Sequence, residues 1–302
     1  MTDPSTRSAS SPPNDRTSIE ALSGVLRGPA RAGKEDDSVS QAPLTIGMHG
    51  VLGRMGTRIL QLLLEDPTFR LGAALDRADH PELGRDVGPL VGAGPLGVPV
   101  TSSLESTVDV LIDFSTPSAT LKIAETAASL GIPLVVGTTG LETPHRDHLL
   151  SYSRTIPILV SPNMSRAVNL LMSLTAIAAK SLGTLADVEI IERHHHFKKD
   201  APSGTALRLA EIVADAIQTR DFVHGRHGQV GERKPGEIGL HALRVGDNPG
   251  EHTVVFGLLG DTIELTHRAL NRDGFARGAL DAARFLADKP ARLYSMADLV
   301  AI

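Results

Sequence analysis

The most informative residues of the chain lie between Glu192 and Ala206, where the sequence reads E-R-H-H-H-F-K-K-D-A-P-S-G-T-A. Histidines titrate near neutral pH and can donate a proton during a reaction, whereas Lys198 carries a fixed positive charge. Ser203 is a favourable helix-capping residue, and the backbone N–H groups at such a helix start bind a carboxylate or a phosphate. The segment therefore predicts a catalytic acid beside a site for an organic anion.

Two other interpretations of the histidines remain open. They could belong to a solvated strand end, or Glu192, His194 and His196 could bind zinc from alternate positions of an extended strand. If residues 192–198 are extended, His194 and His196 lie on the same side as Lys198. His195 then lies on the opposite side. A lysine so close would repel a divalent cation, so we predict an anion site and no metal.

A second motif, Gly50-Val51-Leu52-Gly53-Arg54-Met55-Gly56, follows an apolar strand and opens a helix. Glycines at this spacing allow a tight turn and let the backbone and the helix N-terminus approach a pyrophosphate. Asp76 ends the next strand, where an acid can accept hydrogen bonds from the adenosine ribose, while Arg77 could hold a 2′-phosphate. This pair leaves the choice between NADH and NADPH open. A glycine-rich turn that binds nothing is the alternative interpretation.

Two further strands end in residues suited to a ligand. One is followed by Gly137-Thr138-Thr139-Gly140, and the other ends in Asp113-Phe114-Ser115-Thr116-Pro117. Ligands of open α/β sheets bind over the carboxyl ends of the strands, where threonine hydroxyls can bond a ring amide or sugar and Phe114 can flank a nicotinamide. Arg272 falls where the second segment of the chain returns to the first, and it could contact a ligand there. All of these could equally be ordinary turn or surface residues.

The order of elements along the chain predicts an α/β fold. Between residues 44 and 160 apolar strands, the first two at 44–49 and 69–75, alternate with helices, the first at 54–65. This alternation indicates βαβ units and a Rossmann-type parallel sheet. After residue 163 the pattern changes to a long helix, 166–182, and then to strands with one clear helix, 203–216. That pattern indicates an α+β domain with a mostly separate sheet. A helix at 274–288 is expected to pack back on the first sheet. We therefore predict a dinucleotide-binding domain at 44–164 with 272–302, and a second domain at 165–271.

The composition is that of a globular protein and excludes several function classes. The chain has 302 residues, of which 41% are hydrophobic, no cysteine, and a formal net charge of −5. Without cysteine there is no disulfide, thiolate nucleophile or iron–sulfur cluster, and an acidic chain is not a general nucleic-acid binder. No uninterrupted run approaches the roughly 18 apolar residues of a membrane span, and no signal peptide is recognisable. We expect a disordered extension at 1–43 and a cytoplasmic protein without nucleic-acid or membrane partners.

Taken together, these motifs resemble the dihydrodipicolinate reductase family, from about Leu44 to the C-terminus. The segment Glu192–Ala206 is similar to the family's pattern E-x-H-H-x-x-K-x-D-A-P-S-G-T-A, and the turn Gly50–Gly56 and the motif Gly137–Gly140 also fit. The resemblance implies an NADPH- or NADH-dependent oxidoreductase that converts 4-hydroxy-tetrahydrodipicolinate, a small cyclic dicarboxylate, to tetrahydrodipicolinate in diaminopimelate and lysine biosynthesis. It also implies that the second domain has an open mixed β-sheet, binds the substrate and forms a homotetramer.

The resemblance further implies a role for individual residues. His194 is expected to be the general acid and Lys198 its cationic partner. The residues expected to bind the substrate's carboxylates are His195, Lys198, Ser203, Gly204 and Thr205. The residues expected to line the cofactor site are Gly50, Gly53, Arg54, Met55, Gly56, Asp76, Arg77, Phe114, Gly137, Thr138, Thr139, Ser161, Asn163, Met164 and Arg272.

Three rival functions remain. The chain could be a nicotinamide-dependent reductase with another imine or keto substrate, or a regulator that binds NADPH without turnover. The His194–Lys198 pair argues against a regulator, because a sensor needs no proton donor. A metal-dependent hydrolase is the third. The chain also departs from the family pattern at Pro162 and Ala167, next to the expected nicotinamide contacts.

Overall fold

The first part of the fold is built around a parallel sheet of seven strands. The computed structural model describes residues 42–300. The strands lie in the order β3-β2-β1-β4-β5-β6-β12, and every neighbouring pair is parallel. Because the central strand β4 lies between β1 and β5, the carboxyl ends of these three strands lie side by side, where ligands of such sheets bind. The strands are β1 Leu44–His49, β2 Phe69–Leu75, β3 Val100–Thr101, β4 Val110–Asp113, β5 Leu134–Val136, β6 Ile158–Val160 and β12 Leu293–Tyr294.

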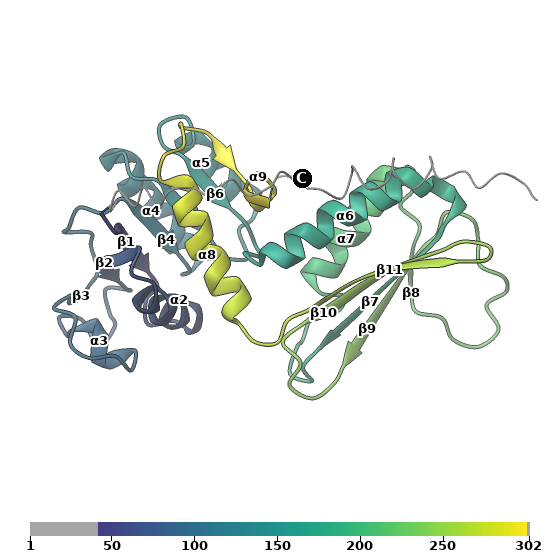
Figure 1. The fold of residues 1–302 in the computed structure, drawn as a ribbon, viewed down its shortest axis with the longest axis horizontal. Helices are drawn as coiled ribbons and strands as arrows, with labels where there is room; N and C mark the ends of the chain where they lie inside the picture. The colour runs from purple at the N-terminus through teal and green to yellow at the C-terminus, as the bar shows by residue number, and fades with distance from the viewer. Residues whose placement is uncertain (1–41, 301–302) are drawn as a thin grey trace, which may run out of the picture. The chain divides into compact units, whose positions relative to one another are not determined.

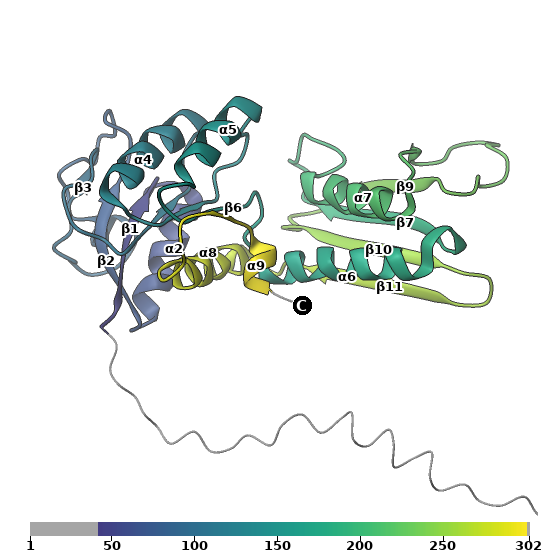
Figure 2. The same cartoon turned by 90° about the horizontal axis from the view of Figure 1, so that it is seen from above.

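Helices cover both faces of this sheet (Figure 2). On one face lie α2, Arg54–Glu65, and α8, Asp273–Leu286, whose apolar sides pack against β1 and β4. On the other face lie α4, Pro117–Leu130, and α5, Thr143–Tyr152. Both faces of the central strands are therefore buried, which explains their continuous apolar runs. Short helices α3, Val87–Leu90, and α9, Met296–Val300, complete this part of the chain.

A second sheet of five strands is built from residues between the two segments of the first. Its order is β11-β10-β7-β9-β8. β10 is antiparallel to both of its neighbours, whereas β7, β9 and β8 are parallel, so the sheet is mixed. Figure 1 shows α6 and α7 over one face of this sheet, and none of the described helices covers the other. The elements are α6 Arg166–Leu182, η1 Gly183–Leu185, β7 Asp187–His194, α7 Gly204–Ile217, β8 Phe222–His224, β9 Ile238–Arg244, β10 Glu251–Gly257 and β11 Thr262–Arg268.

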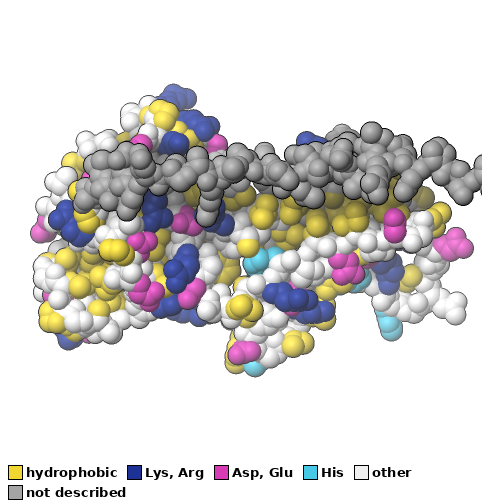
Figure 3. Space-filling model, in the orientation of Figure 1, with side chains coloured by type: hydrophobic (Ala, Val, Ile, Leu, Met, Phe, Trp, Pro, Cys, Tyr) yellow, Lys and Arg dark blue, Asp and Glu magenta, His cyan; other side chains and the backbone are white. Residues whose placement is uncertain are grey.

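Helix α6 presents apolar side chains to its surroundings. Leu170, Leu174 and Ile177 recur at helical spacing and are 39–50% exposed, and Figure 3 shows hydrophobic side chains along this helix. Among the described residues, Arg166–Leu185 is the one helical span that could cross a membrane by length and composition. Polar residues interrupt its apolar run, so the sequence alone did not predict this span. Because α6 also packs against α7 and β11, length and composition alone are weak evidence for a membrane span.

The structure confirms the expected fold class, a Rossmann-type parallel sheet followed by a mixed sheet. The strands Leu44–His49 and Phe69–Leu75 and the helices Arg54–Glu65 and Arg166–Leu182 have the predicted bounds, and α8 packs back on the first sheet as expected. The analysis missed the short elements α3, β3, β8, η1 and β12, which lack a periodic apolar pattern. The predicted disordered extension, 1–43, lies outside the described residues apart from its last two positions.

Candidate active site

The glycine-rich turn links β1 to α2. Gly50 has a φ of +75°, and a Cβ atom on Gly56 would come within 2.1 Å of the Gly50 carbonyl oxygen, so the helix start packs directly on the turn. Gly53 caps α2 without a side-chain bond. Asp76 accepts a hydrogen bond from the Leu52 N–H at 3.0 Å and therefore holds the turn to the end of β2. The helix N-terminus carries a partial positive charge, which favours an anion at this turn.

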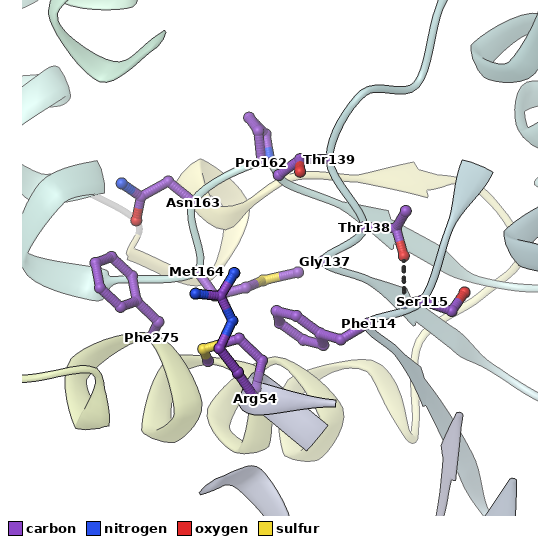
Figure 4. Close-up of a pocket in the computed structure, with 11 residues that line it drawn as sticks. Arg54, Phe114, Ser115, Gly137, Thr138, Thr139, Pro162, Asn163, Met164 and Phe275 are labelled. Carbon is purple, nitrogen blue, oxygen red and sulfur yellow. Dashed lines mark hydrogen bonds between the residues drawn. The ribbon is translucent and has the colours of Figure 1, made fainter. Parts of the chain in front are cut away.

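A cavity of about 340 Å³ opens at the carboxyl ends of β4 and β5, next to this helix start. Eight of the residues expected at a cofactor site line it. They are Arg54, Met55, Phe114, Gly137, Thr138, Thr139, Asn163 and Met164. Three other lining residues, Ser115, Pro162 and Phe275, were not among the expected cofactor residues, although Ser115 belongs to one of the strand-end motifs and Pro162 is next to the expected nicotinamide contacts. Figure 4 shows that their side chains come from five separate parts of the chain: the start of α2, the loop after β4, the loop after β5, the segment before α6, and α8.

The remaining expected cofactor residues lie outside this cavity. Ser161 is buried, and its hydroxyl donates a hydrogen bond to the Asn163 carbonyl at 2.8 Å, so it shapes the loop instead of facing the cavity. Arg77 is largely exposed and pairs with Asp79 at 3.2 Å. Arg272 lines a second cavity, at the start of α8.

A buried charge cluster holds His194 at the end of β7. Glu192 is 1% exposed and accepts a hydrogen bond from His194 Nδ1 at 2.5 Å. The guanidinium of Arg244 donates to both carboxylate oxygens of Glu192, at 2.9 and 3.0 Å. Burial alone would raise the pKa of Glu192, but the hydrogen bonds from Arg244 and His194 outweigh it and the pKa is lowered. Glu192 is therefore a carboxylate that fixes the ring of His194.

His194 itself has a lowered pKa. Burial, the largest cause, disfavours the imidazolium and lowers the pKa, and the positive charges of Lys198 and Arg244 lower it further. The hydrogen bond to Glu192 raises the pKa but does not offset these effects. With Nδ1 bound to Glu192, Nε2 is the ring nitrogen that remains for a reacting group.

The extended geometry predicted for residues 192–198 is wrong. Strand β7 ends at His194, and the chain then turns, because the His195 N–H donates to the Asn248 carbonyl and the Lys198 N–H donates to the His195 carbonyl. As a result His194, His195 and Lys198 line the same cavity, whereas His196 is exposed and bonds the Gly246 carbonyl at 3.0 Å.

The zinc alternative also depended on that extended geometry. The carboxylate of Glu192 accepts hydrogen bonds from His194, Ser203 and Arg244. Residues 42–300 contain no group of three His, Asp or Glu side chains arranged to hold a metal ion.

The second cavity, of about 740 Å³, shares a wall with the first. Arg54, Met55 and Phe275 line both of them. Lys198 Nζ lies 2.9 Å from both carboxylate oxygens of Asp200, so in this structure its charge is already paired. The other lining residues are Thr57, Arg58, Gln61, His194, His195, Asp247, Pro249, Asn271, Arg272 and Asp273.

The helix start at Ser203 has the expected capping geometry. Ser203 Oγ accepts a hydrogen bond from the Ala206 N–H at 3.2 Å, and the Ser203 N–H donates to Glu192 at 3.0 Å. The cap uses the Ala206 N–H, so the N–H groups of Gly204 and Thr205 are the ones that could face a ligand. Asn163 donates to Thr205 Oγ1 at 3.2 Å and so joins the wall of the first cavity to this helix start.

Sequence reasoning missed the partners that hold these groups. Arg244 lies 52 positions beyond Glu192, and only the parallel pairing of β7 with β9 brings them together. His252 is 3% exposed and its Nε2 lies 3.0 Å from Ser203 Oγ, and Asp113 is fully buried at the end of β4. A signal was present, because each of these polar residues falls on an inward-facing position of an apolar strand.

Comparison with known proteins identifies the family. Family models described as "Dihydrodipicolinate reductase, N-terminus" and "Dihydrodipicolinate reductase, C-terminus" match residues 44–164 and 167–300. Relatives named 4-hydroxy-tetrahydrodipicolinate reductase include those of Rhodopirellula baltica, 45% identical over 86% of this chain and 97% of the relative, and of Anaeromyxobacter sp., 46% identical over 84% and 96%.

Solved structures share the fold. A dipicolinate-bound dihydrodipicolinate reductase from a Paenisporosarcina species has a TM-score of 0.68 and 24% identity, covering 84% of this chain and 97% of the other. An amine dehydrogenase from Mycobacterium smegmatis has a TM-score of 0.56 and 11% identity, covering 85% and 96%. The family models together span nearly all described residues and the relatives are well above 30% identical, so the resemblance seen in the sequence is confirmed and the chain belongs to the dihydrodipicolinate reductase family.

Proposed function

We propose that the chain reduces 4-hydroxy-tetrahydrodipicolinate to tetrahydrodipicolinate by hydride transfer from NADPH or NADH, with loss of the 4-hydroxyl group as water, in the diaminopimelate route to lysine. The proposal follows from the family and from the names of relatives that match over most of their length. One structural observation carries it: the cavity with the imidazole of His194 and the amine of Lys198 adjoins the cavity at the carboxyl ends of β4 and β5. A proton donor and a nucleotide site would then act on one substrate.

The residues at the first cavity fit a nicotinamide nucleotide. Because the turn Gly50–Gly56 has glycines, a phosphate could come close to the backbone at the start of α2. Phe114 presents an apolar ring beside the cavity. A reduced nicotinamide bound there supplies a hydride to the substrate. Asp76 and Arg77 at the end of β2 would face the adenosine ribose, with Asp76 suited to free hydroxyls and Arg77 to a 2′-phosphate.

The second cavity and the start of α7 together fit a small dicarboxylate. Lys198, released from Asp200, would bind one carboxylate together with His195. Ser203, Gly204 and Thr205 line neither cavity in this structure. The N–H groups of Gly204 and Thr205, at the positive end of α7, would bind the other carboxylate. Such a pair of anion sites holds the substrate in one orientation and favours a diacid over a monoacid.

His194 would donate the proton that completes the reduction. The carbon next to the reduced position must be protonated, and general acid catalysis of this kind contributes about 10²–10⁴-fold. Glu192 binds Nδ1, so the transferred proton leaves from Nε2. The negative charges of a bound diacid would raise the proton affinity of His194 and counter the effect of its burial.

A comparison of neighbouring histidines tests this role. His194→Ala should lower kcat by about 10²–10⁴-fold and leave the Kd of NADPH within twofold, because the ring transfers a proton and does not hold the nucleotide. His196→Ala, an exposed residue two positions away, is the matched control and should behave like the wild type. Turnover is measured as loss of NADPH and NADH absorbance with enzymatically generated substrate. Equal kcat for His194→Ala and His196→Ala would remove His194 from the mechanism.

Three coarser expectations complete the proposal. We propose that residues 44–164 with 272–302 and residues 165–271 act as a dinucleotide-binding and a substrate-binding domain, in line with the division between the two sheets. We propose a homotetramer formed through the second sheet, whose face opposite α6 and α7 no described helix covers. We also propose that the enzyme is cytoplasmic, as suits an amino-acid biosynthetic reductase.

A further inference from the structure

A fully buried carboxylate lies at the end of β4, beside the residues that line the first cavity. Asp113 is 0% exposed. Its Oδ1 accepts from His49 Nδ1 at 2.6 Å and from Ser115 Oγ at 2.5 Å. Its Oδ2 accepts from Thr120 Oγ1 at 2.6 Å and from Thr138 Oγ1 at 2.7 Å. An ionised carboxylate offers about four acceptor sites, so Asp113 is saturated.

This saturation determines what Thr138 can do. A hydroxyl has one hydrogen to donate, and Thr138 gives it to Asp113. Its remaining capacity is as an acceptor, and it accepts the backbone N–H of Ser115 at 2.8 Å, the bond drawn in Figure 4. Thr138, which we expected to donate to the cofactor, therefore ties the loop after β5 to the loop after β4.

These two loops form much of the first cavity. The loop after β4 carries Phe114 and the loop after β5 carries Gly137 and Thr139, and all three residues line it. We propose that Asp113 is a positioning residue for the nicotinamide half of the cofactor site, acting through Thr138. The inference rests on the proposed function only for the identity of the cofactor, since the bonding pattern itself belongs to the chain.

The four donors include an internal control. Thr120 donates to the same carboxylate oxygen as Thr138, at 2.6 Å against 2.7 Å, with the Thr116 carbonyl as a longer alternative acceptor at 3.0 Å, and both threonines are buried. Thr120 lies on α4 and does not line the cavity, whereas Thr138 does. A change of threonine to valine keeps the shape and removes one bond to Asp113 in either case. A purely structural role predicts equal consequences for the two variants, and a positioning role predicts different ones.

The experiment measures binding, independently of turnover. The probes are NADPH and 2′-phospho-ADP-ribose, which is NADPH without its nicotinamide, titrated into the full-length protein. Thr138→Val should weaken NADPH binding about tenfold, the equivalent of ~1.4 kcal/mol, and leave 2′-phospho-ADP-ribose within twofold. Thr120→Val should leave both within twofold. Asp113→Asn should reproduce the pattern of Thr138→Val, and adding Thr138→Val to it should weaken NADPH no further.

Three results would overturn the inference. They are equal NADPH affinities for Thr138→Val and Thr120→Val, an equal loss for the nucleotide and its fragment, and wild-type NADPH affinity in Asp113→Asn. If Thr138→Val does not fold, Thr138→Ser replaces it. Because serine keeps the hydroxyl, Thr138→Ser should bind NADPH like the wild type, whereas Asp113→Asn should bind NADPH more weakly. A loss of NADPH affinity in both variants would contradict the inference. A wild type that binds NADPH but does not reduce the dicarboxylate would refute the proposed function alone.

Discussion

His194 depends on a single carboxylate for its orientation. Glu192 lies two positions earlier on β7, faces the same side of the sheet, and holds His194 Nδ1 at 2.5 Å while Arg244 holds Glu192. In the proposed reaction the proton that reaches the substrate would therefore come from Nε2, and the carboxylate would stabilise the imidazolium before transfer. This arrangement makes Glu192 part of the acid's environment although it lines neither cavity.

Glu192→Gln should therefore impair the acid. The amide removes the negative charge that raises the pKa of His194. We therefore expect kcat to fall about 10–100-fold. We also expect activity to be lost at a lower pH than in the wild type as the pH is raised. The pH profile of kcat is the measurement, because an unfolded fraction lowers kcat without moving the profile. Glu211→Gln, on the exposed face of α7, is the control. An unmoved profile in Glu192→Gln would contradict the assigned role.

The wild-type enzyme should show two different pH limits. In the free enzyme, burial lowers the pKa of His194 below its ordinary value of 6.5, so the acid form is lost as pH rises through that lowered value. A bound diacid raises the pKa again. Hence kcat/KM, which reports the free enzyme, should fall at lower pH than kcat, which reports the complex. Coincident limits, measured from pH 5 to 9, would be evidence against a buried acid.

Gly250 leaves the space that His194 needs. A Cβ atom at this position would lie 3.0 Å from His194 Nε2, and Gly250 has a φ of +148°, which other residues rarely adopt. Gly250→Ala should therefore displace the acid and lower kcat at least tenfold, with NADPH binding unchanged. Gly228→Ala, also at positive φ but with open space around its Cβ position, is the control for backbone strain. Equal kcat in the two variants would mean that Gly250 does not protect Nε2.

At the scale of elements, the pairing of strands β7, β10 and β11 places three polar side chains next to one another in the second sheet. His252 on β10 pairs with Glu192 on β7 and with His267 on β11. The Nδ1 atoms of both histidines have no hydrogen-bond partner within residues 42–300. Burial lowers the pKa of His252 to about 3, and it also lowers the pKa of His267. His252 is therefore neutral in the folded protein near pH 6, where an unfolded chain would bind a proton.

Stability should fall in mild acid because of these histidines. Below about pH 6.5 the unfolded state protonates His252 and the folded state does not until about pH 3, so the free energy of unfolding decreases as pH falls through this window. Each such proton contributes a slope of about 1.4 kcal/mol per pH unit. His252→Gln should reduce the slope between pH 6 and 5 by roughly that amount in urea titrations. The exposed His196→Gln should not change the slope, and a slope unaffected by His252→Gln would contradict the burial argument.

The sequence predicted elements far better than it predicted their contacts. Local patterns gave β1, α2 and α6 with their correct bounds, because each has a strong apolar periodicity. They also placed the cap at Ser203. They did not show that the chain turns after His194, because that turn depends on a hydrogen bond to Asn248, more than fifty positions away. Arg244 and His252 were missed for the same reason, since strand pairing is not local.

At the scale of the whole molecule, one face of the second sheet needs an explanation. Ile190 and Val254 face α7 and are fully buried, so Ile191 and Val255 point to the opposite face, where they are half-buried. Apolar side chains on an uncovered sheet face are typical of an interface. The homotetramer expected from the family would bury them.

A charge on this face should therefore break the assembly. Val255→Glu is expected to lower the solution mass from about four times the 31.9 kDa of the chain to that of a smaller species, measured by light scattering. Leu130→Glu changes an apolar residue that is 57% exposed on α4, at the first sheet, and should leave the mass unchanged. A wild type that is monomeric at micromolar concentration, or a Val255→Glu variant of wild-type mass, would exclude this interface.

The most direct test of the account is a crystal structure of the protein with NADPH and pyridine-2,6-dicarboxylate. The account predicts that one carboxylate lies against Lys198 and His195 and the other against the N–H groups of Gly204 and Thr205. It also predicts His194 Nε2 toward the ring of the diacid and the nicotinamide beside Phe114. A diacid bound away from Lys198 and the start of α7, or a nicotinamide outside the cavity at β4 and β5, would contradict it.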